Sequence, residues 1–215
     1  MTGLFLTFEG GDGSGKSTQS ALLAEWLRQQ GETVTLTREP GGTELGDEIR
    51  DIVLHRRGHI APRAEALLYA ADRAHHIAIK VRPALERGEI VLQDRYLDSS
   101  VAYQGAGRIL LTDEVRKLSL WASEGLLPNL TVLLDLDESA ARDRLKARTK
   151  YDRLEGEEQD FHARVRAAYL DLAAAEPNRF LVLNAADSVE SLAEAVRERV
   201  RVLLAQGERQ PGHLG

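Results

Sequence analysis

The sequence predicts an α/β fold, a three-layer sandwich built on a five-stranded parallel sheet. Five short apolar, β-rich runs are each followed by a longer stretch with helical periodicity. Strict alternation of this kind favours a parallel sheet with right-handed crossovers and helices on both faces. The 215 residues suffice for one domain of ordinary size. We therefore expect a single domain over residues 1–205 and a flexible tail over 206–215.

The predicted strands follow one another along the chain as Leu4–Phe8, Thr33–Thr37, Ile90–Gln93, Leu130–Asp135 and Phe180–Leu183. Each is four to six residues long, as buried parallel strands commonly are. Ligands bind such sheets at the carboxyl ends of the strands, so the loops after the first four strands are the places to search for a site.

Three long helices can be read between and after these strands. Ser17–Gln30 has one apolar face and ends at Gly31, a typical C-terminal cap. Pro62–Arg87 is a second helical stretch, which Pro83 should end or kink because it lacks an N–H group. A third amphipathic helix is predicted over Val189–Leu204.

Composition narrows the classes of protein. Hydrophobic residues make up 43% of the chain and charged residues 29%, with a formal net charge of -6. A whole-surface binder of nucleic acid or of anionic membranes needs an excess of Lys and Arg, so neither partner is expected. Cysteine is absent, which excludes disulfides, thiolate metal sites and cysteine nucleophiles. With no basic leader and no apolar run near about 18 residues, we expect a cytoplasmic protein.

A phosphate-binding loop follows the first predicted strand. The segment fits G-x-x-x-x-G-K-[ST] at every position, between a predicted strand and a predicted helix. Glycines let successive N–H groups converge on phosphate oxygens, the lysine supplies a mobile cation, and the serine hydroxyl can ligate Mg²⁺. The predicted ATP-binding residues are Gly10, Gly11, Asp12, Gly13, Ser14, Gly15, Lys16, Ser17 and Thr18, with Ser17 as the metal ligand.

Such a loop indicates a nucleoside triphosphate without fixing the reaction. No guanine-reading N-K-x-D tetrapeptide occurs, and the Asp135–Asp137 strand end is a weak signal for a motor ATPase. A small single domain is better suited to moving a γ-phosphoryl group onto a small acceptor.

Residues suited to binding an acceptor lie where the site is expected. Arg38 follows the second strand and Arg95 the third, and a guanidinium fork binds two oxygens of a phosphate monoester at once. Tyr69 and Arg73 are four residues apart, so they share one helix face and can contact one planar base. A polar cluster after Arg95 includes Gln104, whose amide can read a base edge.

Five segments together resemble the thymidylate kinase family, in order and at its spacings, over about Leu4–Leu204. They are Phe8–Thr18, Thr37–Thr43, Leu67–Arg73, Asp94–Tyr96 and Ser99–Gly105. The resemblance implies a P-loop nucleoside monophosphate kinase fold, a homodimer, and MgATP-dependent phosphorylation of dTMP to dTDP.

The resemblance also implies roles for individual residues. It places Asp12 at the acceptor sugar 3′-hydroxyl, Arg95 at the acceptor phosphate and Tyr69 on the face of thymine, where the family commonly has Phe. It further implies that Arg73, Gln104 and Ser100 contact the polar edge of the base, that Tyr103 crowds a ribose 2′-hydroxyl, and that Arg38 and Arg50 line the acceptor cleft.

A basic segment predicts a lid over about 142–155. The segment from Arg142 to Arg153 contains six Lys or Arg residues and only two Asp, so its net charge is positive within a protein whose net charge is negative. The variable positions of the phosphate-binding loop hold no arginine, so the chain resembles the bacterial type, whose lid supplies the catalytic arginine. Lys16, Arg95, Arg153 and Arg148 are the predicted catalytic residues, with Arg153 preferred over Arg148.

Two other functions remain open at this stage. A kinase for another nucleotide, or for a nucleoside, would share the fold, and a nucleoside kinase would need a carboxylate base such as Glu9. A nucleotide-sensing switch would bind ATP or GTP without needing a base-reading cluster.

Overall fold

The computed structural model describes residues 3–56, 58–137, 140, 153–154, 157, 159–207 and 212–213. Its centre is a five-stranded parallel sheet in the order β2-β3-β1-β5-β6. These strands span Leu4–Glu9 (β1), Val34–Arg38 (β2), Ile90–Asp94 (β3), Leu130–Asp135 (β5) and Phe180–Asn184 (β6). The predicted α/β class and five-stranded parallel sheet are confirmed.

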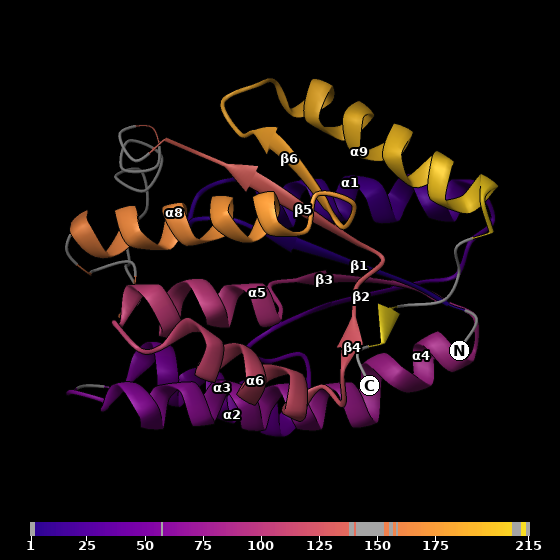
Figure 1. Cartoon of the computed structure of the whole chain (residues 1–215). Helices are drawn as coiled ribbons and strands as arrows, with labels where there is room; N and C mark the ends of the chain where they lie inside the picture. The colour runs from indigo at the N-terminus through magenta and orange to yellow at the C-terminus, as the bar shows by residue number, and fades with distance from the viewer. Residues whose placement is uncertain are drawn as a thin grey trace.

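Helices cover both faces of the sheet (Figure 1). On one face α1 (Lys16–Gln29) and α9 (Val189–Ala205) pack on the sheet, and α1 begins one residue earlier than the predicted helix. The other face carries α8 (Gln159–Ala175), α5 (Leu97–Ser100) and the π-helical η3 (Val101–Gly107). Alternate residues of β1 point to opposite faces of the sheet. Leu4 and Leu6 pack in the hydrophobic cluster with α1 and α9, and Phe5 packs in the cluster on the other face.

The second predicted helix runs as three consecutive segments, α3 (Pro62–His76), the π-helical η2 (Ile77–Val81) and α4 (Arg82–Glu86). Pro83 therefore does not separate two distant helices. It lies in the first turn of α4, where a missing N–H group costs least, and a π-helical segment precedes it.

The remaining elements complete the layer around α3. They are α2 (Glu44–Arg50), the π-helical η1 (Asp51–His55) and α6 (Thr112–Ala122). Thr43 caps α2 by accepting a hydrogen bond from Gly46 N–H at 2.9 Å. Figure 1 shows α2, α3 and α6 gathered on the side away from α1 and α9.

A short two-stranded sheet lies apart from the central sheet. Gly212–His213 (β7) pairs antiparallel with Leu126–Leu127 (β4), which the sequence analysis did not anticipate. The flexible tail over 206–215 stays a prediction from the sequence. Two residues are too few for a hydrophobic pattern that would predict a strand, and β7 pairs with β4, which is brought beside it only by folding.

Within the described part of the chain, no helix is long and apolar enough to cross a membrane.

Candidate active site

The phosphate-binding loop connects β1 to α1. Gly10, Gly13 and Gly15 all have positive φ, at 130°, 77° and 98°. A Cβ on Gly10 would lie 2.4 Å from the carbonyl oxygen of Leu134, so only glycine fits the close passage of the loop beside β5. The loop thus curls at the N-terminus of α1, where backbone N–H groups and the helix dipole favour an anion.

Lys16 is folded back into this loop. Its ammonium donates to the carbonyl oxygens of Gly10 at 3.1 Å and Gly11 at 2.8 Å. Burial, together with the nearby Arg95 guanidinium, lowers the pKa of Lys16 to about 8. A bound phosphate would place negative charge beside Lys16 and would therefore favour its protonated, ammonium form.

A hydroxyl and a carboxylate meet at the start of α1. The Ser17 hydroxyl donates to Asp94 Oδ2 at 2.9 Å, and Asp94 Oδ1 is buried with no hydrogen-bond partner in the described part of the structure. Both groups are hard oxygen ligands of the kind that Mg²⁺ prefers. Both groups therefore fit Mg²⁺ as ligands, and the sequence analysis gave no role to Asp94.

Arg95 is the centre of the polar groups between the phosphate-binding loop and the helices. Its φ is +66°, an uncommon value for a residue other than glycine. Its guanidinium donates to Asp12 Oδ1 at 2.5 Å and to the Tyr103 hydroxyl at 3.2 Å, and it lies over the Tyr103 ring. Burial alone would raise the pKa of Asp12, yet Arg95 and Lys16 outweigh it and lower that pKa.

Glu9 accepts three hydrogen bonds from residues that surround Arg95. The Tyr96 N–H group donates to Glu9 Oε1 at 2.7 Å, while the hydroxyls of Ser99 and Tyr169 donate to Oε2 at 2.6 and 2.9 Å. Burial and the neighbouring Asp98 raise the pKa of Glu9 to about 7. Its bond to the residue after Arg95 stabilises the strained backbone that aims the Arg95 side chain.

A cleft opens beside Arg95. It gathers eight of the predicted substrate-binding residues, Asp12, Arg50, Tyr69, Arg73, Arg95, Ser100, Tyr103 and Gln104. Six further lining residues were not among the predicted site residues, namely Glu39, Pro40, Leu54, Tyr96, Ser99 and Leu154. Arg38 is not among the lining residues, and its half-exposed side chain pairs with Asp47 at 3.3 Å.

Arg73 is buried and fixed at the inner end of the cleft. It donates from Nε to Glu39 at 2.9 Å, from Nη1 to the Ser119 hydroxyl at 3.1 Å and from Nη2 to the Ser100 hydroxyl at 3.2 Å. The guanidinium also lies over the Tyr96 ring. Three of its five donors are used, so it retains hydrogen-bonding capacity toward the cleft.

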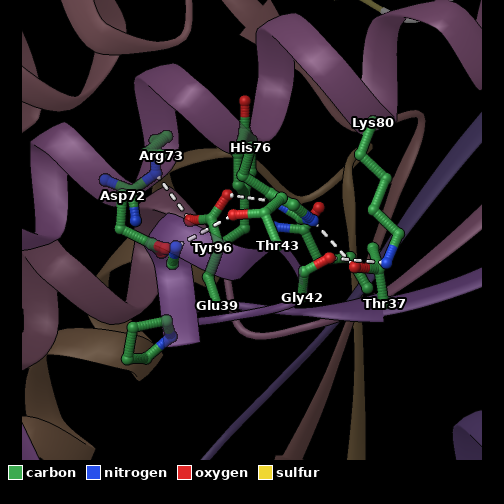
Figure 2. Close-up of polar contacts among 12 residues, drawn as sticks. Thr37, Glu39, Gly42, Thr43, Asp72, Arg73, His76, Lys80 and Tyr96 are labelled. Carbon is green, nitrogen blue, oxygen red and sulfur yellow. Dashed lines mark hydrogen bonds and ion pairs between the residues drawn. The ribbon is translucent and has the colours of Figure 1, made fainter. Parts of the chain in front are cut away.

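Figure 2 shows how this arginine is held from behind. Glu39 accepts from Arg73 with one oxygen and contacts His76 Nδ1 at 3.0 Å with the other, and His76 Nε2 lies 2.7 Å from the Thr37 hydroxyl. The carboxylate therefore joins β2, which carries Thr37, to α3, which carries Arg73. This support could not be read from the sequence, where Glu39 is one of 34 acidic residues.

The loop after β2 is tied to the same helices. Gly41 N–H donates to Asp72 Oδ1 at 3.1 Å, and Lys80 Nζ donates to the Gly42 carbonyl at 2.7 Å (Figure 2). Burial and the nearby Glu39 carboxylate raise the pKa of Asp72 to about 8. Pro40, which lines the cleft, and Arg50, which donates to the Pro40 carbonyl at 2.9 Å, are positioned by this loop.

Gln104 lies on η3 and meets a second buried carboxylate. Its Nε2 donates to Glu65 Oε1 at 3.0 Å, and Arg108 also donates to Glu65, at 3.2 and 3.3 Å. Glu65 is fully buried. Its burial could not be predicted, because a glutamate in the first turn of a helix is usually solvated and stabilised there by the helix dipole.

Most of the predicted lid, including Arg148, lies outside the described residues. Arg153 is described, and its hydrogen bonds go to η1 and α3 rather than to the phosphate-binding loop. Its side chain donates to Glu65 Oε2 and, at 2.9 Å, to the Val53 carbonyl, while its N–H donates to the Leu54 carbonyl at 3.1 Å.

Comparisons with known proteins agree on one family. The thymidylate kinase family model matches residues 8–196. The thymidylate kinase of Clavibacter sepedonicus is 71% identical over 96% of this chain and 99% of the relative, and that of Leifsonia xyli subsp. xyli is 73% identical over 92% and 94%. The crystal structure of thymidylate kinase from Ehrlichia chaffeensis superposes with a TM-score of 0.77 at 30% identity, covering 94% of this chain and 99% of that one. The chain therefore belongs to the thymidylate kinase family.

Proposed function

We propose that this protein transfers the γ-phosphoryl group of MgATP to dTMP, giving dTDP and ADP. The observation that carries the proposal is the continuity of the cleft. The same cleft is lined by Asp12 and Arg95, which pair with each other beside the phosphate-binding loop, and by Tyr69, Arg73 and Gln104. A nucleoside monophosphate laid along it would direct its phosphate at the γ-phosphoryl group of a bound triphosphate.

The donor side needs charge and positioning more than covalent help. The loop N–H groups and the Lys16 ammonium would hold the triphosphate, with Ser17 and Asp94 holding Mg²⁺, which would neutralise charge on the transferring group. An oxygen of the acceptor phosphate attacks the γ-phosphorus, and the bond from that phosphorus to the β-γ bridging oxygen breaks, leaving ADP.

The acceptor side divides into phosphate, sugar and base contacts. Arg95 would bind the dTMP phosphate, Asp12 would accept from the 3′-hydroxyl, and Tyr103 would exclude a 2′-hydroxyl. Tyr69 would stack on thymine, while Arg73, Gln104 and Ser100 contact its polar edge and Arg50 and Arg38 add positive charge to the cleft. Because Arg38 pairs with exposed Asp47, its contribution requires that weak surface pair to open.

The geometry favours a monophosphate over a nucleoside as acceptor. A nucleoside kinase needs a free carboxylate base at the 5′-hydroxyl, but Glu9 accepts three hydrogen bonds and is not among the residues that line the cleft. Arg95 occupies the corresponding end of the cleft instead, and an arginine there binds a phosphate.

We propose that a lid arginine stabilises the transferring phosphoryl group. Arg153 and Arg148 stay the candidates, with Arg153 preferred. In this structure Arg153 pairs with Glu65, so it would have to exchange that carboxylate for the phosphoryl group when the lid closes.

We also propose a homodimer formed through α3 and α6. Leu67, Leu111 and Trp121 are 58, 68 and 79% exposed, and they lie on or next to these two helices. Exposed large apolar side chains are suited to an interface between copies, and a twofold axis pairs such a surface with itself. The cytoplasmic location and the lack of nucleic-acid or membrane partners remain predictions from the sequence.

Acceptor specificity is the direct test. ADP release would be measured with MgATP and, one at a time, dTMP, dUMP, CMP, AMP, GMP and thymidine. We expect strong turnover with dTMP. ADP release with an acceptor other than dTMP, and none with dTMP, would refute the proposed base contacts. No ADP release with any of the six acceptors would favour a nucleotide-binding switch.

A matched pair of variants tests the phosphate end. Arg95→Gln should reduce kcat/KM for dTMP by about a hundredfold or more and leave the KM for ATP little changed, because a buried, charge-assisted contact is lost. Arg116→Gln is the control, since Arg116 is also partly buried and ion-paired, with Glu176, but is not among the cleft-lining residues.

A further inference from the structure

Glu65 is a buried carboxylate with three hydrogen-bond partners, two from η3 and its C-cap and one from farther along the chain. It lies in the first turn of α3, is 0% exposed, and accepts from Gln104 and Arg108 with Oε1 and from Arg108 and Arg153 with Oε2. Two guanidinium groups and one amide donate to it, so Glu65 serves as the hydrogen-bond acceptor toward all three partners.

We propose that Glu65 is a positioning residue for base selection, because it fixes which end of the Gln104 amide faces the cleft. This proposal rests on the proposed function, in which Gln104 contacts the base. A carboxylate accepts but cannot donate, so only the Nε2 end of Gln104 can face it. The amide is planar, and its Oε1 branch therefore points away from Glu65.

The orientation of this amide distinguishes pyrimidines. Thymine and uracil carry an N3–H donor, which pairs with an amide oxygen, whereas N3 of cytosine is an acceptor. Arg73 presents donors beside Gln104 in the same cleft, which suits a carbonyl at C4 and opposes the amino group of cytosine. Together the two side chains present an acceptor and a donor, the complement of a thymine edge.

The contacts of Glu65 predict what a neutral amide would do there. Oε2 accepts from two guanidinium groups, whereas Oε1 accepts from one guanidinium and one neutral amide. In Glu65→Gln the remaining carbonyl oxygen is best placed at the Oε2 position, where both charged donors need it. Its NH₂ group would then face Gln104, which must turn over to offer its oxygen and would present Nε2 to the cleft.

The test is base selectivity. In Glu65→Gln we expect kcat/KM for dTMP and dUMP to fall together by about ten- to hundredfold, since a donor would oppose N3–H. The value for dCMP should fall less or rise, so the dTMP to dCMP ratio should drop at least about tenfold. The dTMP to dUMP ratio should stay constant, because the two bases share this edge.

Arg108→Gln is the matched control. It removes a partner of Glu65 but leaves the Glu65 to Gln104 hydrogen bond in place, so the dTMP to dCMP ratio should be unchanged even if the melting temperature falls. If Glu65→Gln does not fold, Glu65→Asp keeps the charge but withdraws the carboxylate from Gln104. Its dTMP to dCMP ratio should fall in the same direction.

The outcomes separate the two ideas. A parent protein that does not phosphorylate dTMP refutes the proposed function. An active parent, with all three acceptors reduced equally in Glu65→Gln or in Glu65→Asp, refutes the positioning role alone, because a purely structural residue would not change selectivity.

Discussion

Replacing Glu39 with glutamine should disturb both the stability of the fold and the binding of the acceptor base. Glu39 pairs with Arg73 at 2.9 Å and contacts His76 at 3.0 Å, and its side chain is 2% exposed (Figure 2). The change keeps the shape of the side chain but removes its charge. It therefore leaves the Arg73 guanidinium buried without a counter-charge.

The expected size of the effect follows from that burial. Removing one partner of a buried ion pair costs about 3 to 5 kcal/mol, and the retained amide oxygen still accepts one hydrogen bond, which favours a value of about 3 kcal/mol. For a chain of this length that loss lowers Tm by about 6 to 12 °C. We also expect a higher KM for dTMP with little change in the KM for ATP, because Arg73 would lose its anchor.

The pH dependence provides an independent check. Burial alone would raise the pKa of Glu39, but Arg73 and His76 outweigh it and hold the pKa below its ordinary value of 4.5. A carboxylate with a lowered pKa in the folded state stabilises the protein above its unfolded pKa, and that stabilisation is lost as the pH falls through the folded pKa. The Tm difference between parent and Glu39→Gln should therefore be full at neutral pH and narrow below about pH 4.5.

Calorimetry and steady-state kinetics on the two proteins decide the matter. Glu194→Gln is the matched control, because Glu194 pairs with Arg201 and Arg197 on the exposed face of α9 and should leave Tm nearly unchanged. If Glu39→Gln retained both the parent Tm and the parent KM for dTMP, the assignment of Glu39 as the anchor of Arg73 would be refuted.

Three other changes have defined outcomes. Raising the pH through about 8 should reduce kcat/KM for ATP, since the ammonium of Lys16 in the free enzyme loses its proton there; a profile that stays flat beyond this pH would contradict the assignment. Arg153→Ala should lower the single-turnover rate constant for phosphoryl transfer by about 10³-fold or more. A rise confined to the KM for dTMP would instead mean that Arg153 only holds Glu65. Trp121→Glu should convert a dimer to a monomer in sedimentation experiments, while Val202→Glu, at an exposed apolar position on α9, should not; equal behaviour of the two variants would argue against an interface at α6.

The strands, their order of alternation with helices and the phosphate-binding loop were predictable because their signals are local. The loop from Gly10 to Ser17 is contiguous, and its spacing follows from the mechanics of binding phosphate. The position of Arg95 was predictable for a related reason, since the ends of parallel strands meet at one edge of the sheet. The short β4 and β7 strands left no pattern of comparable length.

The pairing of buried charges was decided by the tertiary structure alone. Glu65 and Arg153 are 88 residues apart, and Glu39 and Arg73 are 34 apart, so no periodicity relates them. The free energy of a buried carboxylate depends on which cations and donors surround it after folding, and a sequence does not show that neighbourhood. Local patterns therefore predict the order of the elements, the phosphate-binding loop and the arginines that follow the second and third strands. Folding decided which carboxylates hold those arginines and the Gln104 amide, because desolvation and pairing act over a few ångströms in space rather than along the chain.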